Sequence, residues 1–133
     1  MSQFYPRGLQ AIAEAYFTGT APSNVELYCV GVTADYVFSG NHQLIAELGG
    51  NICMEEVQIQ NLTFTNGVVS GDDIRFIRPL AGPQTAALII YAKFDGGSQL
   101  LAYLGDGAVG TIPHLLNGTD VIIRWHENGI LKI

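Results

Sequence analysis

Two neighbouring segments in the second half of the chain are apolar at nearly every position. Residues 85–94 (TAALIIYAKF) and 99–104 (QLLAYL) flank Asp95-Gly96-Gly97-Ser98, which has the composition of a turn, and together they predict a β-hairpin. Antiparallel strands usually wet one face and alternate apolar with polar residues. Because these two strands do not alternate, both faces of their sheet must be covered. The N-terminal helix and a neighbouring subunit are the two covers that we consider.

That helix is expected because apolar residues recur close to the N-terminus at the spacing of one helical stripe: Leu9, Ile12, Ala13, Tyr16 and Phe17. Gly19 and Pro22 then end it.

Further strands are expected downstream of the helix. Residues 25–32 (VELYCVGV) have the β-branched and aromatic composition of a strand, and residues 36–38 favour a further short one. Residues 42–48 (HQLIAEL) have the length of two helical turns, which Gly49-Gly50 would break. The chain then reads as strands, with a turn signal at Asn66-Gly67.

A corner is expected at Gln60-Asn61. Val57 and Ile59 keep one alternating phase, whereas Leu62 and Phe64 keep the opposite phase. An extra residue must reset the pleat between them, which predicts a bulge or a corner. The whole pattern predicts a mainly β fold, an antiparallel β-sandwich or Greek-key barrel with one short N-terminal helix. It forms a single domain, 1–133, with an arm and helix at about 1–18 and the sandwich at about 25–133.

The C-terminal residues predict a second hairpin, with two possible registers. A two-residue turn at Asn128-Gly129 would mix charged and bulky side chains on both faces. A three-residue loop, 127–129, with Gly129 in the left-handed conformation instead puts four apolar side chains on one face: Ile123, Trp125, Leu131 and Ile133. Burying such side chains is worth several kcal/mol, so we favour the second register.

In the favoured register, Arg124 lies opposite Lys132 on the outer face. Two neighbouring cations on an acidic protein suggest contact with an acidic partner surface, so both residues are candidate partner contacts. The alternative is that Glu127 or another nearby acid compensates them.

Composition limits the partners. Charged residues are 14% of the chain and hydrophobic residues 48%, which is little charge for an ordinary monomer surface. Either Gly and uncharged polar residues keep the surface soluble, or part of it meets other chains. The net charge of -6, without a basic cluster, argues against nucleic acid and membrane partners. Residues 1–8 lack signal-peptide features, so synthesis in a cytoplasm is expected.

No catalytic, cofactor or metal site is expected. The three histidines, at positions 42, 114 and 126, lack metal-ligand spacing to one another or to a cysteine. Cys29 and Cys53 stand in apolar surroundings and are expected as buried free thiols. The pair Asp72-Asp73 fits a capping or turn role. The sequence therefore predicts a protein that is not an enzyme and that uses no cofactor.

The order of segments provides a further indication. An apolar strand (AALIIYAKF), a short turn and a second strand (LLAYLGDG) lead through residues 117–120 (NGTD) into VIIRWHENGILKI. Earlier, FYPRGLQAIAEAYF precedes a strand followed by residues 34–36 (ADY), a short helix-like piece and NLTFTNGVVSGDDIRF. Over nearly the whole chain, this order resembles a family of small virion proteins of tailed bacteriophages. It departs from that pattern at residues 108–116, where a Pro-rich loop is usual and only Pro113 remains.

The resemblance implies a structural role in the virion. It implies an accessory or decoration component of the head, a homo-oligomer made in the host cytoplasm that contacts other virion proteins, the major capsid protein first. Placement at the neck or tail is an alternative. A carbohydrate-binding module at the tail tip is another, for which the six tyrosines would line the surface instead of packing in the core.

Overall fold

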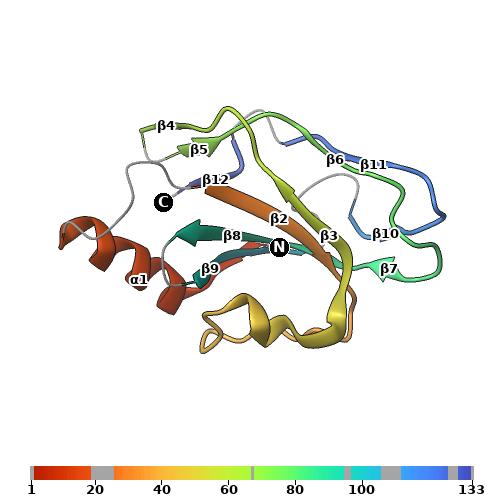
Figure 1. Cartoon of the computed structure of the whole chain (residues 1–133), viewed down its shortest axis with the longest axis horizontal. Helices are drawn as coiled ribbons and strands as arrows, with labels where there is room; N and C mark the ends of the chain where they lie inside the picture. Colours follow the sequence, from red (N-terminus) through yellow and green to blue (C-terminus); the bar gives the residue numbers. More distant parts are fainter. Residues whose placement is uncertain are drawn as a thin grey trace.

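A computed structural model describes residues 2–18, 26–66, 68–94, 97–105, 112–125 and 129–132 (Figure 1). In chain order its elements are β1 (Ser2–Phe4), α1 (Pro6–Phe17), β2 (Glu26–Val32), the 3₁₀ helix η1 (Ile45–Asn51), β3 (Ile52–Gln58), β4 (Thr63–Thr65), β5 (Val68–Ser70), β6 (Ile74–Phe76), β7 (Gln84–Thr85), β8 (Ala87–Phe94), β9 (Gly97–Leu104), β10 (His114–Leu115), β11 (Val121–Ile123) and β12 (Leu131–Lys132).

An antiparallel sheet of five strands, in the order β1-β9-β8-β2-β3, forms the centre of the molecule. Three small sheets, β12-β5-β4, β11-β6 and β10-β7, complete the strand pairing. Figure 1 shows the first two of these lying above the central sheet in the view, which makes a sandwich-like arrangement. The prediction of a mainly β, antiparallel fold is therefore confirmed.

The predicted hairpin is formed by β8 and β9, and β9 begins two residues earlier than expected. Phe94 pairs with Gly97, so Gly97 and Ser98 belong to β9 and not to the loop. Asp95 and Gly96 lie outside the described residues. The register shifts once, between Ile90 and Tyr91, where β9 contributes an extra residue.

The first face of the hairpin is buried in the core between the two β layers. Leu88 and Ile90 of β8 are fully buried there. Phe76 of β6 and Ile123 of β11 belong to the same apolar cluster and come from the opposite layer. Burial of these side chains stabilises the pairing of the layers by about 1.5 to 3 kcal/mol for each large residue.

The second face of the hairpin is buried by the chain itself. Ile89 and Tyr91 of β8 pack in a second cluster with Tyr36 and Leu48, which belong to the connection between β2 and β3. Tyr5, just before α1, completes this cover and is fully buried. The cover proposed from sequence, helix or neighbouring subunit, is thus provided over these positions mainly by the segment 36–48.

That segment differs locally from its prediction. Residues 36–38 do not form a strand, because Tyr36 and Phe38 turn their rings into the second cluster instead of pairing their backbones. The helical turns begin at Ile45, not at residue 42, since Leu44 forms an isolated β-bridge with Gln99. The expected break is present, with Gly49 at φ 62°.

The corner at Gln60-Asn61 is confirmed. β3 ends at Gln58, and Asn61 adopts a φ of 54°, which only a few non-glycine residue types tolerate well. The Asp72 N–H donates to the Gln60 carbonyl at 3.0 Å, which ties the corner to the chain beyond β5. Asn66 also has a positive φ, of 53°, in the turn between β4 and β5, while Gly67 lies outside the described residues.

The predicted C-terminal hairpin is wrong. β11 pairs with β6, matching Ile123 with Ile74, and β12 pairs with β5, matching Leu131 with Val69. Both strands therefore take partners from much earlier in the chain and lie in different sheets. Residues 127 and 128 of the expected loop are not among those described.

The reason lies in the residues that flank the loop. Trp125 donates its backbone N–H to Asp73 Oδ1 at 3.1 Å and its indole N–H to the Asp72 carbonyl at 2.8 Å, which anchors the end of β11 beside β6. Gly129 has the positive φ expected for it, 101°, but a Cβ there would lie 2.3 Å from Cγ1 of Val68. The glycine thus permits close approach to β5 and not a turn back onto β11.

Gly8 gives a test of how α1 packs on β9. A Cβ at position 8 would lie 1.7 Å from the Leu100 carbonyl oxygen, so the backbones would have to separate. We expect Gly8→Ala to lower the free energy of unfolding by about 2 to 3 kcal/mol in chemical denaturation. This is opposite in sign to the gain of about 1 kcal/mol that alanine brings to an exposed helix. The matched control is Gly40→Ala, which has no atom within 4 Å of its Cβ and should change stability by less than about 0.5 kcal/mol. An unchanged or raised stability of Gly8→Ala would contradict the close packing.

Candidate interaction surface

A groove of about 630 Å³ lies between strand β3 and the residues that follow β6. One wall is formed by β3, which is an edge strand of the central sheet and pairs only with β2 among the described strands. The other wall runs from Phe76 to Pro83. We call this feature the β3 groove.

The β3 wall is interrupted by a bulge. Cys29 pairs with Val57 and Gly31 with Met54, so three steps along β3 match two steps along β2. The extra residue falls at Glu55 and Glu56, both of which are exposed and line the groove. A bulge and charged side chains are the features that protect sheet edges from pairing with another strand. This wall therefore favours contact through side chains.

The opposite wall displays apolar side chains. Ile77 is 64% exposed and Leu80 is 82% exposed, although both are large aliphatic residues. Between them Arg78 has a φ of 40°, a conformation that costs energy in a long side chain such as arginine. Asp120 stabilises it by accepting the Arg78 N–H at 2.9 Å, and it also lies 3.5 Å from the Arg75 guanidinium. The fold thus fixes an apolar loop in an outward position.

The charges of the groove divide into paired and unpaired groups. Glu56 forms an ion pair with Lys93, with 2.7 Å between the Nζ and Oε1 atoms. The side chains of Glu55 and Arg78 have no ion-pair or hydrogen-bond partner within the part of the chain that the structure describes. The groove therefore carries one available anion and one available cation.

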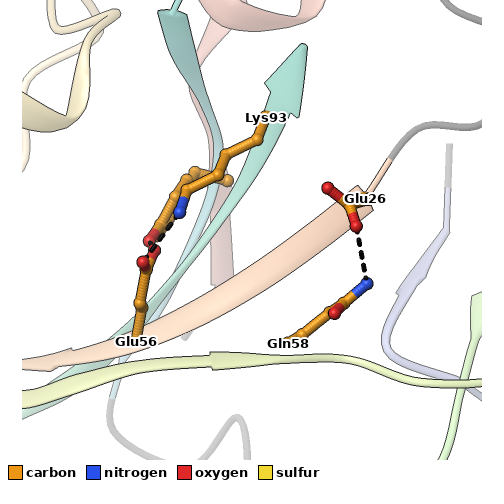
Figure 2. Close-up of polar contacts among 5 residues, drawn as sticks. Glu26, Glu56, Gln58 and Lys93 are labelled. Atoms are coloured by element: carbon orange, nitrogen blue, oxygen red, sulfur yellow. Dashed lines mark hydrogen bonds and ion pairs between the residues drawn. The ribbon is translucent and has the colours of Figure 1, made fainter.

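Glu56 also anchors a polar cluster on the second face of the sheet (Figure 2). Its carboxylate accepts hydrogen bonds from the Tyr91 hydroxyl and from Lys93, while Gln58 donates to Glu26 at 3.2 Å. Here the sheet face is polar, beyond the residues that segment 36–48 covers. All the charged groups drawn in Figure 2 are paired, which is typical of a structural network.

This cluster shifts the pKa values of its members. Burial opposes ionisation of Glu56, but the hydrogen bonds from Lys93 and Tyr91 and the charge of Lys93 outweigh it and lower the pKa of Glu56. Burial, followed by the hydrogen bond to Glu56, raises the pKa of Tyr91 far above its ordinary value. Tyr91 therefore acts as a donor that stays protonated.

The aromatic residues of this face offer little open ring surface. Tyr28 and Tyr91 stack with 5.8 Å between ring centroids, and the Lys93 ammonium lies 4.2 Å from the Tyr28 centroid. Tyr91 is only 2% exposed. Trp125 donates its indole N–H to the Asp72 carbonyl and is half-buried against the core between the two β layers.

Four of the five histidines and cysteines singled out in the sequence lie among the described residues. His42 Nδ1 bonds the Tyr36 hydroxyl at 2.8 Å, His114 pairs with Thr85 in the β10-β7 sheet, and His126 lies outside the described residues. Cys29 is a buried free thiol whose pKa is raised by burial, and Cys53 is a half-buried free thiol 3.3 Å from the Thr85 hydroxyl. In the described ranges, no three His, Cys, Asp or Glu residues gather as a metal site.

The predictions made for the acidic pair Asp72-Asp73 and for the two cations, Arg124 and Lys132, have different outcomes. Asp72 and Asp73 have a structural role, but it differs from the predicted cap or turn: they lie outside any turn and hold the Gln60-Asn61 corner and Trp125 by long-range hydrogen bonds. Arg124 is exposed just after β11, whereas Lys132 lies in β12 of another sheet, so the predicted register that set them opposite one another is wrong.

Sequence reasoning missed Ile77 and Leu80. A signal was present, since residues 77–83 (IRPLAGP) combine exposed-loop composition with two large aliphatic residues.

The Tyr91 hydroxyl provides a test of the polar cluster. Tyr91→Phe should lower the free energy of unfolding by about 1 kcal/mol, because the Glu56 carboxylate loses a donor. It should also raise the pKa of Glu56 towards its ordinary value of 4.5, measured by NMR titration of the side-chain carboxyl. Because the folded pKa is lowered, the stabilisation is complete above that ordinary value and is lost as the pH falls through the folded pKa. The pH dependence should therefore be weaker in the variant. Tyr103→Phe, at a half-buried tyrosine with no hydroxyl partner in the described part, is the control and should leave Glu56 unchanged.

None of the helices described is long and apolar enough to cross a bilayer. In comparisons with known proteins, no family model, no curated protein and no solved structure matches the chain. Its function is therefore inferred from the residues and surfaces described above.

Proposed function

We propose that this protein is a structural component of a bacteriophage virion, most simply a head decoration protein of the cement type. In that role it binds other virion proteins, the major capsid protein first, and stabilises the capsid through protein-protein contacts. The order of segments along the chain supports this function by its resemblance to small virion proteins of tailed phages. Neck or tail placement would use the same surfaces.

The observation that carries the proposal is the apolar surface beside the β3 groove. Ile77, Leu80 and Leu115 are 64%, 82% and 64% exposed. Hydrogen bonds between Leu116 and the backbone of Gly82 and Pro83, at 3.0 and 2.9 Å, hold the Leu115 segment beside the loop. Large aliphatic side chains that a fold holds outward and close together are typical of the core of a protein interface.

The remaining polar groups support a binding role over a catalytic one. The Tyr5 hydroxyl bonds that of Tyr36 at 2.7 Å, and Tyr36 bonds His42, so this aromatic network is satisfied internally. Glu56 is likewise engaged by Tyr91 and Lys93. Such networks fix packing, whereas a virion component obtains its affinity from modest contacts repeated by symmetry.

Binding to phage heads tests the function directly. We expect the purified protein to co-sediment with heads that lack it and to saturate them at a fixed number of copies per head. Heads already carrying the protein are the control and should bind little more. A strict monomer in light scattering that shows no affinity for heads or for other parts of the particle would contradict the proposal.

Arg124 and Lys132 remain candidate partner contacts, although they do not lie opposite one another. We expect the variant Arg124→Ala/Lys132→Ala to melt within a few degrees of the wild type, because Arg124 is exposed. Head binding should weaken and become less sensitive to salt, since two cations are removed from the interface. Arg7→Ala, at an exposed position of α1, is the control. Equal binding of the double variant and the wild type at low and raised salt would remove the partner role.

A further inference from the structure

We infer that the β3 groove is a self-association surface, in which the loop Ile77 to Pro83 of a second copy of this chain docks. The inference rests on the proposed role as an assembly protein and names the partner of one surface. Three properties of the groove support it: the form of its β3 wall, the conformation of its loop wall and its two available charges.

The β3 wall excludes the simplest alternative, extension of the sheet. A second β3 strand that paired antiparallel over the full length Ile52–Gln58 would bring Glu55 of one copy opposite Glu55 of the other. Like charges placed directly opposite each other destabilise a strand pair. The bulge at these residues also interrupts the ladder that a continuous sheet needs. An occupant must therefore enter the groove with side chains, and not as an added strand.

The loop wall supplies suitable side chains. Leu80 is the most exposed of the large hydrophobic residues described, and Ile77 accompanies it. The positive φ of Arg78, held by the Asp120 carboxylate, fixes the backbone between them. Strained backbone maintained by specific contacts is a feature of binding sites, where a pre-formed shape lowers the entropy lost on association.

The two available charges are arranged for a copy of the same chain. A two-fold axis brings the same surface together from both subunits, so that residue i meets residue j and j meets i. Arg78 of each copy then meets Glu55 of the other, and both charges that lack partners among the described residues become paired. The groove thus complements itself in charge and in its apolar loop.

Charge reversal tests this pairing. The wild type should dimerise reversibly in sedimentation velocity, and raised salt should weaken the dimer. Arg78→Glu and Glu55→Arg should each weaken dimerisation by at least about tenfold, because each variant places two like-charge pairs in its own dimer. An equimolar mixture of the two variants should recover dimers, since in the mixed dimer both pairs again have opposite charges.

The mixture distinguishes an Arg78–Glu55 contact between two copies from the same contact within one chain. If Arg78 and Glu55 interact inside the same chain, the double variant recovers but the mixture does not, and that result would overturn the inference. A wild type that stays monomeric up to millimolar concentration would also overturn it. Leu80→Ser should weaken the dimer but leave the melting temperature unchanged at concentrations where the wild type is monomeric, since association itself stabilises the folded state. Arg7→Glu, on α1 near the opposite edge of the sheet, should change neither.

The two proposals fail differently. A chain that binds heads as a monomer, with the same affinity in Arg78→Glu as in the wild type, removes the self-association surface and leaves the virion function. A chain that dimerises through the groove but binds no part of the particle removes the virion function and leaves the surface.

Discussion

Burial of strand β8 on both faces is the constraint on which the rest of the fold depends. Leu88 and Ile90 point into one core and Ile89 and Tyr91 into another, and none of the four is more than 2% exposed. One sheet therefore needs two covers from a chain of 133 residues. The small sheets provide the first cover. The second cover, segment 36–48, is too short to form a layer of regular structure and consists of aromatic rings and the 3₁₀ helix η1.

The second cover brings polar groups into the interior, and their hydrogen bonds make it possible. Tyr5 and Tyr36 bury their rings while their hydroxyls bond one another and reach His42 at the surface. Burial and the hydrogen bond to Tyr36 raise the pKa of Tyr5, so the Tyr5 hydroxyl stays protonated. At the margin of the cover the sheet face becomes polar, and there the exposed Glu56 accepts hydrogen bonds from Lys93 and from the hydroxyl of the buried Tyr91. The same face of the sheet is thus apolar where segment 36–48 covers it and polar where this cover ends.

The β3 groove follows from the edge of this sheet. The bulge at Glu55 and Glu56 leaves β3 unsuited to pairing, and β6 continues into a loop that stands away from the strand. An apolar loop beside a protected strand gives a surface suited to contact through side chains and not to open-ended strand addition.

Local patterns in the sequence determined several of the elements, and the tertiary structure decided their partners. Periodicity and turn composition were enough for α1, for the β8-β9 hairpin and for the corner at Gln60-Asn61, because each depends on residues close in sequence. The C-terminal hairpin was mispredicted although Gly129 has the expected conformation, because β11 and β12 gained more by joining β6 and β5 than by pairing with each other. The groove was likewise beyond sequence reasoning. Ile77 and Leu80 have the pattern of ordinary aliphatic residues, and the loop that exposes them is held by Asp120, 42 residues after Arg78. Side-chain pattern is local, whereas strand pairing and exposure are set by competition among all the surfaces that the chain can bury.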